Sequence, residues 1–366
     1  MDKFAFIIHP LDVQDVARKF GFARRLPARV IEGALRYLPP MKVSHITGVR
    51  TPYGEVEGYF VGCPLTARQM LELPQGFVLK RIIQAGKVAE KLGARIVGLG
   101  AFTSVVGDAG ITVAENLNIA VTTGNSYTVA TAIEGTKEAA RLMGIDLRCA
   151  HIVVLGATGS IGKVCARILA REATRMTLVA RDTARLEGLA AKILYESGLA
   201  VTVTSDVKKA LRAAQVVIAV TSAVDTLIGP GDLMPGAVVC DVSRPRNVSR
   251  QVAEMRDDVL VIEGGVVEVP GEVNFNFNFG FPPRTAYACM AETMILALEK
   301  RFENFSLGRD ISLEQVEEIS ALAKKHGFKL AGLRSFERAI SREEIEAIRA
   351  RAEARLTGGK KVFIMS

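Results

Sequence analysis

The stretch "HIVVLGATGSIGKVCARIL", residues 151–169, decides the fold class. Its apolar run 152–155 is typical of a buried strand, and residues 160–172 have the spacing of a helix. Gly156, Gly159 and Gly162 connect the two with GxxGxxG spacing. In a dinucleotide-binding turn the first glycine permits the tight turn and the second lets the backbone approach a pyrophosphate. The third lets helix and strand pack closely, and the helix N-terminus then faces the phosphates.

We therefore predict a dinucleotide site at this turn, formed by Gly156, Thr158, Gly159, Ser160, Ile161 and Gly162. A glycine turn that serves packing alone is the alternative interpretation. The segment C-terminal to the turn favours the dinucleotide site, because its strands and helices alternate as in a parallel, doubly wound sheet. The expected strands are 176–181, 201–205, 216–222, 237–243 and 259–265, and the expected helices between them include 183–197 and 206–213.

The N-terminal half has an α/β pattern of its own. We expect strands at 3–8, 95–100 and 119–122, a hairpin at 43–51 and 55–62, and helices at 11–20, 66–92 and up to Met143. After Pro283 we expect a long helix to about Phe305, then charged helices and a loose tail, "TGGKKVFIMS".

The predicted fold is thus a doubly wound parallel Rossmann sheet with a second α/β domain completed by C-terminal helices. We expect an N-terminal α/β substrate domain at 1–145 and a Rossmann dinucleotide-binding domain at 146–280. The C-terminal helices, 281–366, are expected to pack back on the substrate domain.

The composition excludes several classes of protein. The 366 residues are 49% hydrophobic and 23% charged, and the formal net charge is +8. No apolar run is long enough for an integral membrane segment or a signal peptide, so we expect a cytoplasmic protein. The cysteines and histidines lack the spacing of a metal site, and no nucleic-acid-binding motif is present. A basic surface can attract an acidic partner, and an oligomer is compatible with the sequence.

The end of the second Rossmann strand, "LVARDTAR", indicates which dinucleotide binds. NAD-preferring folds place an acid there for the ribose 2′-hydroxyl, whereas an arginine accommodates a 2′-phosphate. Arg181 and Arg185 offer two cations and Thr183 offers a hydroxyl, so we predict NADP. Asp182 could restore part of an NAD-like contact.

Two further strand ends are candidates for the nicotinamide half of the cofactor. Thr221 and Ser222, in "AVTSA", come after the fourth strand, where the nicotinamide ribose usually lies. Gly265 ends a later strand and would let the ring approach the backbone. A strand end with polar caps and a simple turn are the respective alternatives.

Five cysteines compete for the role of a nucleophile. Cys165 and Cys240 lie in apolar segments predicted to be core, and Cys149 precedes the first Rossmann strand. Cys63, before a proline, could face a cleft. Cys289 lies close to a predicted helix start and near Arg284, both of which favour a reactive thiolate. The residues alone leave open whether Cys289 is this nucleophile or a buried, inert thiol.

The chain resembles the cyanobacterial long-chain acyl-[acyl-carrier-protein] reductases, which make fatty aldehydes. The resemblance runs from about Phe4 to Phe328 and is most specific in "AYACMAETMILALEK" and "NFSLGRDISLEQVEEISALAKKHGF". It also includes "GEVEGYFVGCPL", "VLGATGSIG", "LVARDTARL" and "VIEGGVVE". The resemblance implies that Cys289 takes the acyl group as a thioester and that NADPH reduces it to the aldehyde. It further implies acyl-carrier protein, or acyl-coenzyme A, as the thioester donor.

A more distant resemblance concerns "AVVCDVSRPRNV", which is similar to a strand and loop of glutamyl-tRNA reductases and of shikimate-type dehydrogenases. Segments 266–283 and 23–40 differ from the acyl reductases and could bind the acyl chain or the carrier. Backbone amides near Cys289, or groups in 100–104 and 122–125, are candidates for an oxyanion site. Thr103, Ser104 and Asn125 are equally typical of turn caps.

Two rival functions are compatible with the same sequence. A shikimate- or quinate-type alcohol dehydrogenase shares the two-domain plan and the glycine turn but would use a Lys/Asp pair and no cysteine. A non-catalytic NADP-binding module is the other alternative.

Overall fold

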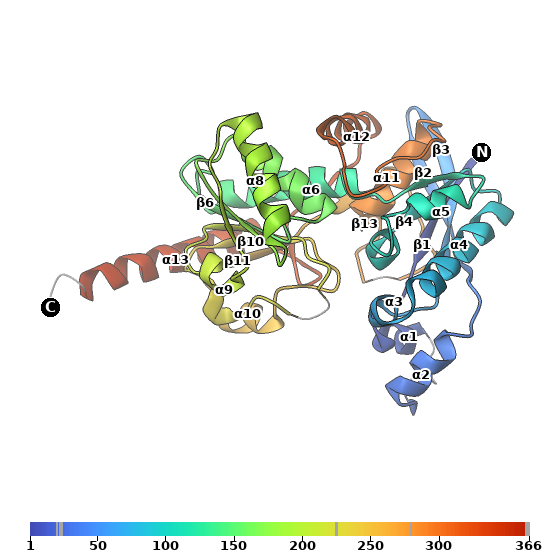
Figure 1. Ribbon diagram of the computed structural model, residues 1–366, viewed down its shortest axis with the longest axis horizontal. Coiled ribbons are helices and arrows are strands. Elements are labelled where there is room, and N and C mark those ends of the chain that lie inside the picture. The colour runs from blue at the N-terminus through green and yellow to red at the C-terminus, as the bar shows by residue number, and fades with distance from the viewer. Residues whose placement is uncertain (20, 22–24, 224–225, 279, 363–366) are drawn as a thin grey trace. The chain divides into compact units, whose positions relative to one another are not determined.

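The computed structural model describes residues 1–19, 21, 25–223, 226–278 and 280–362 (Figure 1). Residue contacts divide the chain into two compact units. Unit 1 comprises residues 1–127 and 267–329, and unit 2 comprises residues 128–266 and 330–366. The last four residues of the predicted C-terminal tail lie outside the described residues, as does residue 20 of the predicted helix 11–20.

Unit 1 is built around a five-stranded sheet in the order β2-β3-β1-β4-β5. The hairpin strand β2 (Met41–Thr51) is antiparallel to β3 (Gly54–Gly62). The other neighbours, β3, β1 (Asp2–Ile8), β4 (Ile96–Leu99) and β5 (Ala120–Thr122), pair in parallel. Because these strands are parallel, His9, Gly100 and Thr123 all follow strand ends at the same edge of the sheet.

Helices surround this sheet, and two of them pack directly on it. Helix α4 (Gln75–Lys91) contacts β1, β2 and β3, and α11 (Ala288–Leu298) contacts β1, β3 and β4. Shorter helices are α1 (Val13–Lys19), α2 (Ala28–Leu35), α3 (Ala67–Glu72) and α5 (Ile111–Glu115). In Figure 1, α1, α2 and α3 lie at the end of the sheet to which β1 leads. Helix α12 (Leu313–His326) contacts α11.

Two long predicted helices of unit 1 are interrupted or shortened. The predicted helix 66–92 is divided into α3 and α4, because Pro74 lacks an N–H and the preceding Leu73 is extended. The predicted helix from Pro283 to Phe305 is also wrong in its bounds. Residues 285–287 form a short strand, β13 (Thr285–Tyr287), and α11 ends at Leu298, two residues before Lys300 adopts a left-handed φ of 56°.

Strand β13 belongs to a small sheet that the sequence pattern did not predict. Its order is β13-β12-β14, with β12 at Val266–Glu268 and β14 at Lys329–Leu330. Helix α2 was likewise not predicted. Helix α6 (Asn125–Leu142), which was predicted, leads the chain from unit 1 into unit 2.

Unit 2 contains a six-stranded parallel sheet in the order β11-β10-β9-β6-β7-β8. This is the doubly wound order in which the chain starts at the centre, at β6, and reverses direction across the sheet. The strands are β6 (His151–Leu155), β7 (Arg175–Val179), β8 (Thr202–Thr204), β9 (Val216–Ala219), β10 (Val238–Asp241) and β11 (Leu260–Glu263). The predicted fold class, a Rossmann-like parallel sheet in a mixed α/β chain, is confirmed.

The predicted helices of this sheet begin at or within one residue of their predicted starts. They are α7 (Ser160–Leu169), α8 (Thr183–Ser197) and α9 (Val207–Leu211), whereas α10 (Arg250–Met255) was not predicted. Buried aliphatic residues from β6, β9 and β10 form the core between the layers, including Val153, Val217 and Val239.

The C-terminal segment is divided between the units. Residues 281–329 group with unit 1, whereas 330–366 group with unit 2. The latter contain a short hairpin, β15 (Arg334–Ser335) and β16 (Arg338–Ala339), and the helix α13 (Arg342–Val362). Arg355 of α13 pairs with Asp257 at 2.6 Å and with Asp258 at 2.8 Å, which explains this grouping. The domain boundaries expected from the sequence stay a prediction, with domains at 1–145, 146–280 and 281–366.

Candidate functional site

The glycine turn of unit 2 has the geometry of a close backbone approach. Gly156 follows β6 with a φ of +84°, and a Cβ there would lie 2.7 Å from the Val220 carbonyl oxygen. A Cβ at Gly162 would lie 2.3 Å from the Gly156 oxygen. Both positions therefore require glycine, and they stand where the sheet order reverses between β6 and β9.

The first turn of α7 has no side-chain cap. Gly159 is its N-cap, and Ser160, Ile161 and Gly162 are the first three helical residues. The first N–H groups of a helix have no partner within the helix, and the helix dipole favours a negative group there. Gly159 is exposed, and Thr158, Ser160 and Ile161 are half-buried. A pyrophosphate fits this arrangement.

The end of β7 presents one arginine that is not paired and one that is. Arg181 is exposed and has no salt bridge within the described chain. Asp182 is the N-cap of α8 and accepts a hydrogen bond from the Arg185 N–H at 3.1 Å. The Arg185 Nε lies 3.2 Å from the Asp182 carboxylate. Asp182 is thus engaged in the cap, with Thr183 the first residue of the helix.

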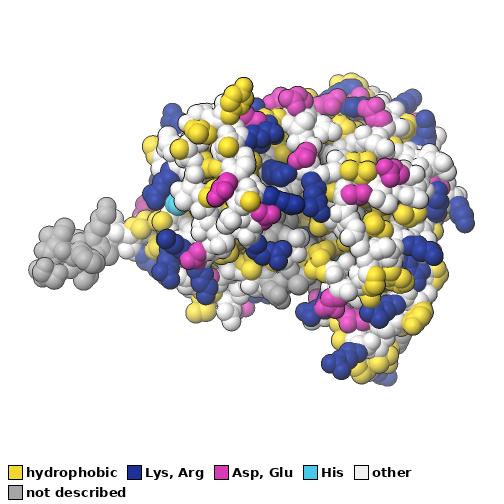
Figure 2. All heavy atoms as spheres, in the orientation of Figure 1, with side chains coloured by type: hydrophobic (Ala, Val, Ile, Leu, Met, Phe, Trp, Pro, Cys, Tyr) yellow, Lys and Arg dark blue, Asp and Glu magenta, His cyan; other side chains and the backbone are white. Residues whose placement is uncertain are grey.

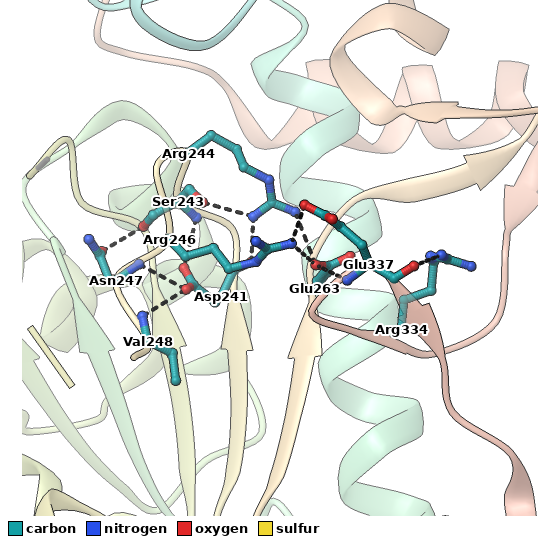
Figure 3. A network of polar contacts seen from close by, with 9 residues as sticks. All are labelled: Asp241, Ser243, Arg244, Arg246, Asn247, Val248, Glu263, Arg334 and Glu337. Carbon is teal, nitrogen blue, oxygen red and sulfur yellow. Dashed lines mark hydrogen bonds and ion pairs between the residues drawn. The ribbon is translucent and has the colours of Figure 1, made fainter. Parts of the chain in front are cut away.

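Thr221 takes part in a hydrogen-bonded loop beyond the ends of β9 and β10. Its N–H donates to Ser243 Oγ at 3.1 Å, and its hydroxyl donates to Asn247 Oδ1 at 2.8 Å. Asp241, at the end of β10, fixes this loop, because its carboxylate accepts N–H groups from Ser243, Asn247 and Val248 at 2.9–3.0 Å (Figure 3). Ser222 is exposed beside it. Burial raises the pKa of Asp241.

An ion-pair network lies next to the end of β11. Arg246 pairs with the buried Glu263, which also accepts the Glu337 N–H at 2.9 Å (Figure 3). Burial opposes ionisation of Glu263, but Arg244 and Arg246 outweigh it and lower its pKa. Gly265 comes two residues after Glu263, with a φ of +86°, and is buried. The predicted cofactor residues, including Gly265, therefore lie at the carboxyl edge of the unit 2 sheet.

The five cysteines differ sharply in their surroundings. Cys63, Cys165 and Cys240 are buried, and burial raises their pKa values, to about 12 for Cys63 and Cys240. Cys149 is exposed, but it precedes β6 at the amino edge of its sheet, away from the strand ends that bind cofactors. Cys289 is half-buried. It is thus the cysteine that is both accessible and set at a carboxyl sheet edge.

Cys289 is the second residue of α11 and the one residue of that helix that is not buried. The N-cap, Tyr287, provides no side-chain cap. The dipole of an uncapped helix start favours the thiolate of a cysteine placed there. This position is compatible with the predicted nucleophile, which stays a prediction.

Glycines from two strand ends let this helix start approach the sheet. A Cβ at Gly124, whose φ is +72°, would lie 2.3 Å from the Cys289 Cα. A Cβ at Gly100 would lie 3.8 Å from the Cys289 sulfur, and one at Gly98 would lie 2.1 Å from Thr293 Oγ1. The close contact between α11 and the ends of β4 and β5 thus depends on residues that lack a side chain.

The turn after β4 is held by His9 and by its own hydroxyls. The Phe102 N–H donates to His9 Nε2 at 3.2 Å, so that Nδ1 carries the proton toward the Pro10 carbonyl at 3.0 Å. Burial lowers the pKa of His9 to about 4, so the ring is neutral. Thr103 and Ser104 hydrogen-bond to Gly100 and Ala101 within the turn, which is the capping role.

Sequence reasoning missed two buried acids beside the predicted residues. Glu292 lies one helical turn after Cys289 and is fully buried, and Asp241 is 1% exposed. A signal was available for Glu292, because it is the lone acid in the otherwise apolar run "ACMAETMILAL". For Asp241 the signal was the "DVSRPRNV" motif.

Comparison with known proteins finds a dehydrogenase family model for part of the chain and two relatives that cover most of it. The family model described as shikimate / quinate 5-dehydrogenase matches residues 137–263. An aminotransferase, PigE, of Serratia sp. is 32% identical over 94% of this chain, but the chain spans only 41% of that relative's length. A long-chain acyl-[acyl-carrier-protein] reductase of Synechococcus elongatus is 28% identical, over 86% of this chain and 94% of the relative.

Among solved structures, quinate dehydrogenase from Corynebacterium glutamicum in complex with NAD is 14% identical, with a TM-score of 0.36. The match covers 71% of this chain and 87% of the quinate dehydrogenase chain. The sequence matches relate the chain, at family level, to NAD(P)-dependent oxidoreductases and support a pyridine nucleotide as the cofactor. Within the described residues, no helix is long and apolar enough to cross a bilayer, and no cluster of acids, histidines and cysteines could hold a metal ion.

Proposed function

We propose that this chain reduces an acyl thioester to an aldehyde with NADPH, through an acyl-enzyme on Cys289. The observation that carries the proposal is the contrast among the five cysteines. Cys289 alone combines partial exposure, an uncapped helix start and a position at a carboxyl sheet edge. The acyl-[acyl-carrier-protein] reductase relative supports the same chemistry for the chain as a whole.

In the proposed reaction the Cys289 thiolate attacks the thioester carbonyl and forms a new carbon–sulfur bond. The carbon–sulfur bond to the donor breaks, and the donor thiol leaves with its electron pair and takes up a proton. NADPH, when bound, supplies the hydride that reduces the acyl carbon. Collapse of the resulting hemithioacetal expels the Cys289 thiolate and releases the aldehyde. Covalent catalysis of this kind divides a difficult step into two easier ones.

NADP is the proposed dinucleotide because the end of β7 offers a cation and no available acid. Arg181 is exposed and unpaired in the described chain, and Asp182 is engaged as the cap of α8. The glycine turn and the open start of α7 would hold the pyrophosphate. Thr221 and Gly265, at the far strand ends, would then line the nicotinamide half.

An exposed surface at the carboxyl edge of unit 1 supports a carrier protein as the donor. This basic apolar patch comprises α2 and its flanks, residues 25–42 (Figure 2, lower right). Tyr37 is 86% exposed and Val30 is 52% exposed, with Arg25, Arg29 and Arg36 around them. The lone acid of residues 25–42, Glu32, is turned toward the Thr66 hydroxyl at 3.5 Å. An acidic partner with an apolar face fits this patch.

The patch separates the two possible donors experimentally. Reversing one charge, R29E, should raise KM for acyl-carrier protein by roughly 5- to 10-fold and leave KM for acyl-coenzyme A unchanged, since coenzyme A does not cover the patch. R212E, on the surface of unit 2, is the matched control. An equal effect of R29E on both donors would contradict carrier binding at this patch.

The proposed reaction is tested with C289A. We expect loss of thioester reduction by roughly 10³-fold or more, with unchanged NADPH affinity measured by fluorescence titration. C149A, at the amino edge of the other sheet, should keep full activity. Retained thioester reduction by C289A would refute the acyl-enzyme.

A second candidate function is a shikimate- or quinate-type alcohol dehydrogenase. The match of its family model to residues 137–263 favours it for unit 2. Such an enzyme would oxidise a hydroxy acid with NADP, and C289A would leave it active. A non-catalytic NADP-binding module would bind NADPH without turning over any thioester or hydroxy acid.

A further inference from the structure

Glu292 is a buried acid that the proposed reaction does not use. It lies on α11, three residues after Cys289, and is fully buried. No lysine, arginine or histidine of the described chain forms an ion pair with it. A carboxylate in such a place is costly unless several hydrogen bonds compensate for the lost water.

The compensating donors come from the turn between β5 and α6 and from the segment beside it. Thr122 Oγ1 donates to Glu292 Oε1 at 2.5 Å, and the Tyr127 N–H donates to Oε2 at 2.8 Å. Hydrogen bonds from the Ser306 side chain and the Gly124 backbone also favour the ionised form, although burial dominates and raises the pKa of Glu292. The carboxyl group thus closes the first turn of α6.

Ser306 holds the same turn as well. Its hydroxyl lies 2.6 Å from Ser126 Oγ, and its carbonyl oxygen accepts the Thr123 hydroxyl at 2.5 Å. Residues 122–127 are therefore fixed between Glu292 and Ser306. Neither of these contacts involves a surface side chain, since Ser126, Thr123 and Ser306 are all buried.

This turn is in direct contact with the cysteine. A Cβ at Gly124 would come within 2.4 Å of the Cys289 Cβ and 2.7 Å of its carbonyl oxygen. Residues three apart on a helix share a face, so Cys289 and Glu292 meet the same turn. Any shift of the turn would displace the start of α11, and with it the thiol.

We infer that Glu292 is a positioning residue for the Cys289 nucleophile. It fixes the turn 122–127 against the start of α11, so that the thiol and its acyl form keep one orientation toward the incoming reactants. Glu292 itself touches neither substrate nor cofactor. The inference rests on the proposed function, since it assigns the residue to the acyl-enzyme step.

The side chains around Glu292 allow a conservative replacement. In E292Q the amide oxygen can accept the Tyr127 N–H, and the amide NH₂ can donate to Thr122 Oγ1, because a hydroxyl both donates and accepts. In E292A both groups lose their partner, and the turn is free to move. A displacement of about 1 Å at a reacting group can cost roughly 10²-fold in rate.

The test compares these variants with acyl-carrier protein and NADPH. We expect E292A to lower kcat per folded molecule by roughly 10²-fold with little change in KM, and E292Q to keep most of the activity. T122V keeps the shape but removes the hydroxyl that donates to Glu292 and accepts the Gly124 N–H at 3.3 Å, and it should lower kcat less than E292A does. I46A, a core substitution in β2, is the control for lost stability and should keep kcat.

A second measurement separates this inference from the proposed function. The rate at which iodoacetamide alkylates Cys289, followed against pH by mass spectrometry, needs no turnover. We expect the alkylation profile of E292A to differ from wild type and that of E292Q to stay close to it. A merely structural Glu292 would lower the melting temperature but leave kcat and the alkylation profile unchanged, and this outcome would overturn the inference. E292Q as impaired as E292A would overturn it as well. Absence of turnover with every thioester would refute the proposed function alone.

Discussion

Two helices of this chain, α7 and α6, follow similar glycine turns, but their first turns are capped differently. Helix α7 and helix α6 each follow a parallel strand and a turn that contains a glycine with positive φ. In α6 this glycine, Gly124 with a φ of +72°, directly precedes the helix, whereas in α7 Gly156, with a φ of +84°, precedes the N-cap Gly159 by three residues. The first turn of α7 has no side-chain cap. The first turn of α6 is met by the Glu292 carboxyl group. Similar glycine turns thus lead to a helix start that offers an anion site in unit 2 and to one that holds an acid of the protein in unit 1.

This difference separates the roles of the two sheet edges. The open helix start in unit 2 suits a dinucleotide phosphate, which must enter and leave. In unit 1 the helix start is permanently filled, and the accessible group at that edge is the sulfur of Cys289. One edge is therefore suited to hold a ligand and the other to hold a reacting atom in a fixed place.

Among the changes that test this comparison of the two helix starts, the largest effect is expected from G156A. Its Cβ would lie 2.7 Å from a backbone oxygen at a left-handed φ, so the turn must open. We expect NADPH affinity, measured by fluorescence titration, to fall by roughly 10²-fold. G188A is the control, because no atom lies within 4 Å of a Cβ there. Unchanged NADPH affinity in G156A would show that the dinucleotide does not bind at this turn.

G124A makes the corresponding change in unit 1. The added Cβ would meet the Cys289 backbone at 2.3 Å, which displaces the nucleophile but leaves unit 2 intact. We expect kcat for thioester reduction to fall by roughly 10- to 100-fold while NADPH affinity stays the same. G76A, in open space on α4, is the matched control. Equal losses of NADPH affinity and kcat would contradict separate roles for the two turns.

A smaller effect is expected from R181A at the end of β7. Loss of the exposed guanidinium should weaken NADPH binding by about 10-fold and leave NADH binding unchanged, since only NADPH carries the 2′-phosphate. R212A serves as the control for a general change in surface charge. A parallel loss of both nucleotides would exclude Arg181 as the residue that selects NADP.

The smallest effect is expected in how the free energy of unfolding depends on pH. Burial raises the pKa of Glu292 above its ordinary value of 4.5, so the folded chain keeps a proton that the unfolded chain releases. The free energy of unfolding should therefore fall as pH rises above 4.5, by at most about 1.4 kcal/mol per pH unit for one proton. Urea denaturation of E292Q should lack this component. An identical pH dependence in both proteins would show that the Glu292 pKa is not raised.

The sequence predicted unit 2 better than unit 1 for a physical reason. Buried parallel strands such as β6 and β9 are continuous apolar runs, and a helix such as α8 has its predicted bounds, 183–197, because Asp182 caps it and Gly198 ends it. In unit 1 the division at Pro74 has a local cause, the missing N–H of proline, which the long apolar pattern of 66–92 masked, and α11 ends before the left-handed Lys300. Helix α2 is only eight residues long, and its apolar face consists mainly of Ile31 and Leu35, which pack with Val13 and Val16.

The candidate site, like the fold, was predictable from the sequence only in part. The glycine turn and Arg181 can be predicted from the local sequence, because each belongs to a short motif next to a strand end. The surroundings of Cys289 could not be predicted, because they include Gly100 and Gly124, which lie far from it in the sequence. Glu292 was missed because its partners, Thr122 and Tyr127, lie 170 and 165 residues away.

The central claim is that the Cys289 sulfur carries the acyl group, and mass spectrometry of its peptide tests this most directly. The protein is incubated with acyl-carrier protein or acyl-coenzyme A, without and then with NADPH. We predict an acyl adduct on Cys289 that accumulates without NADPH and disappears, with release of aldehyde, when NADPH is added. Aldehyde formation with no adduct on Cys289, or an adduct that NADPH leaves unchanged, would contradict the account.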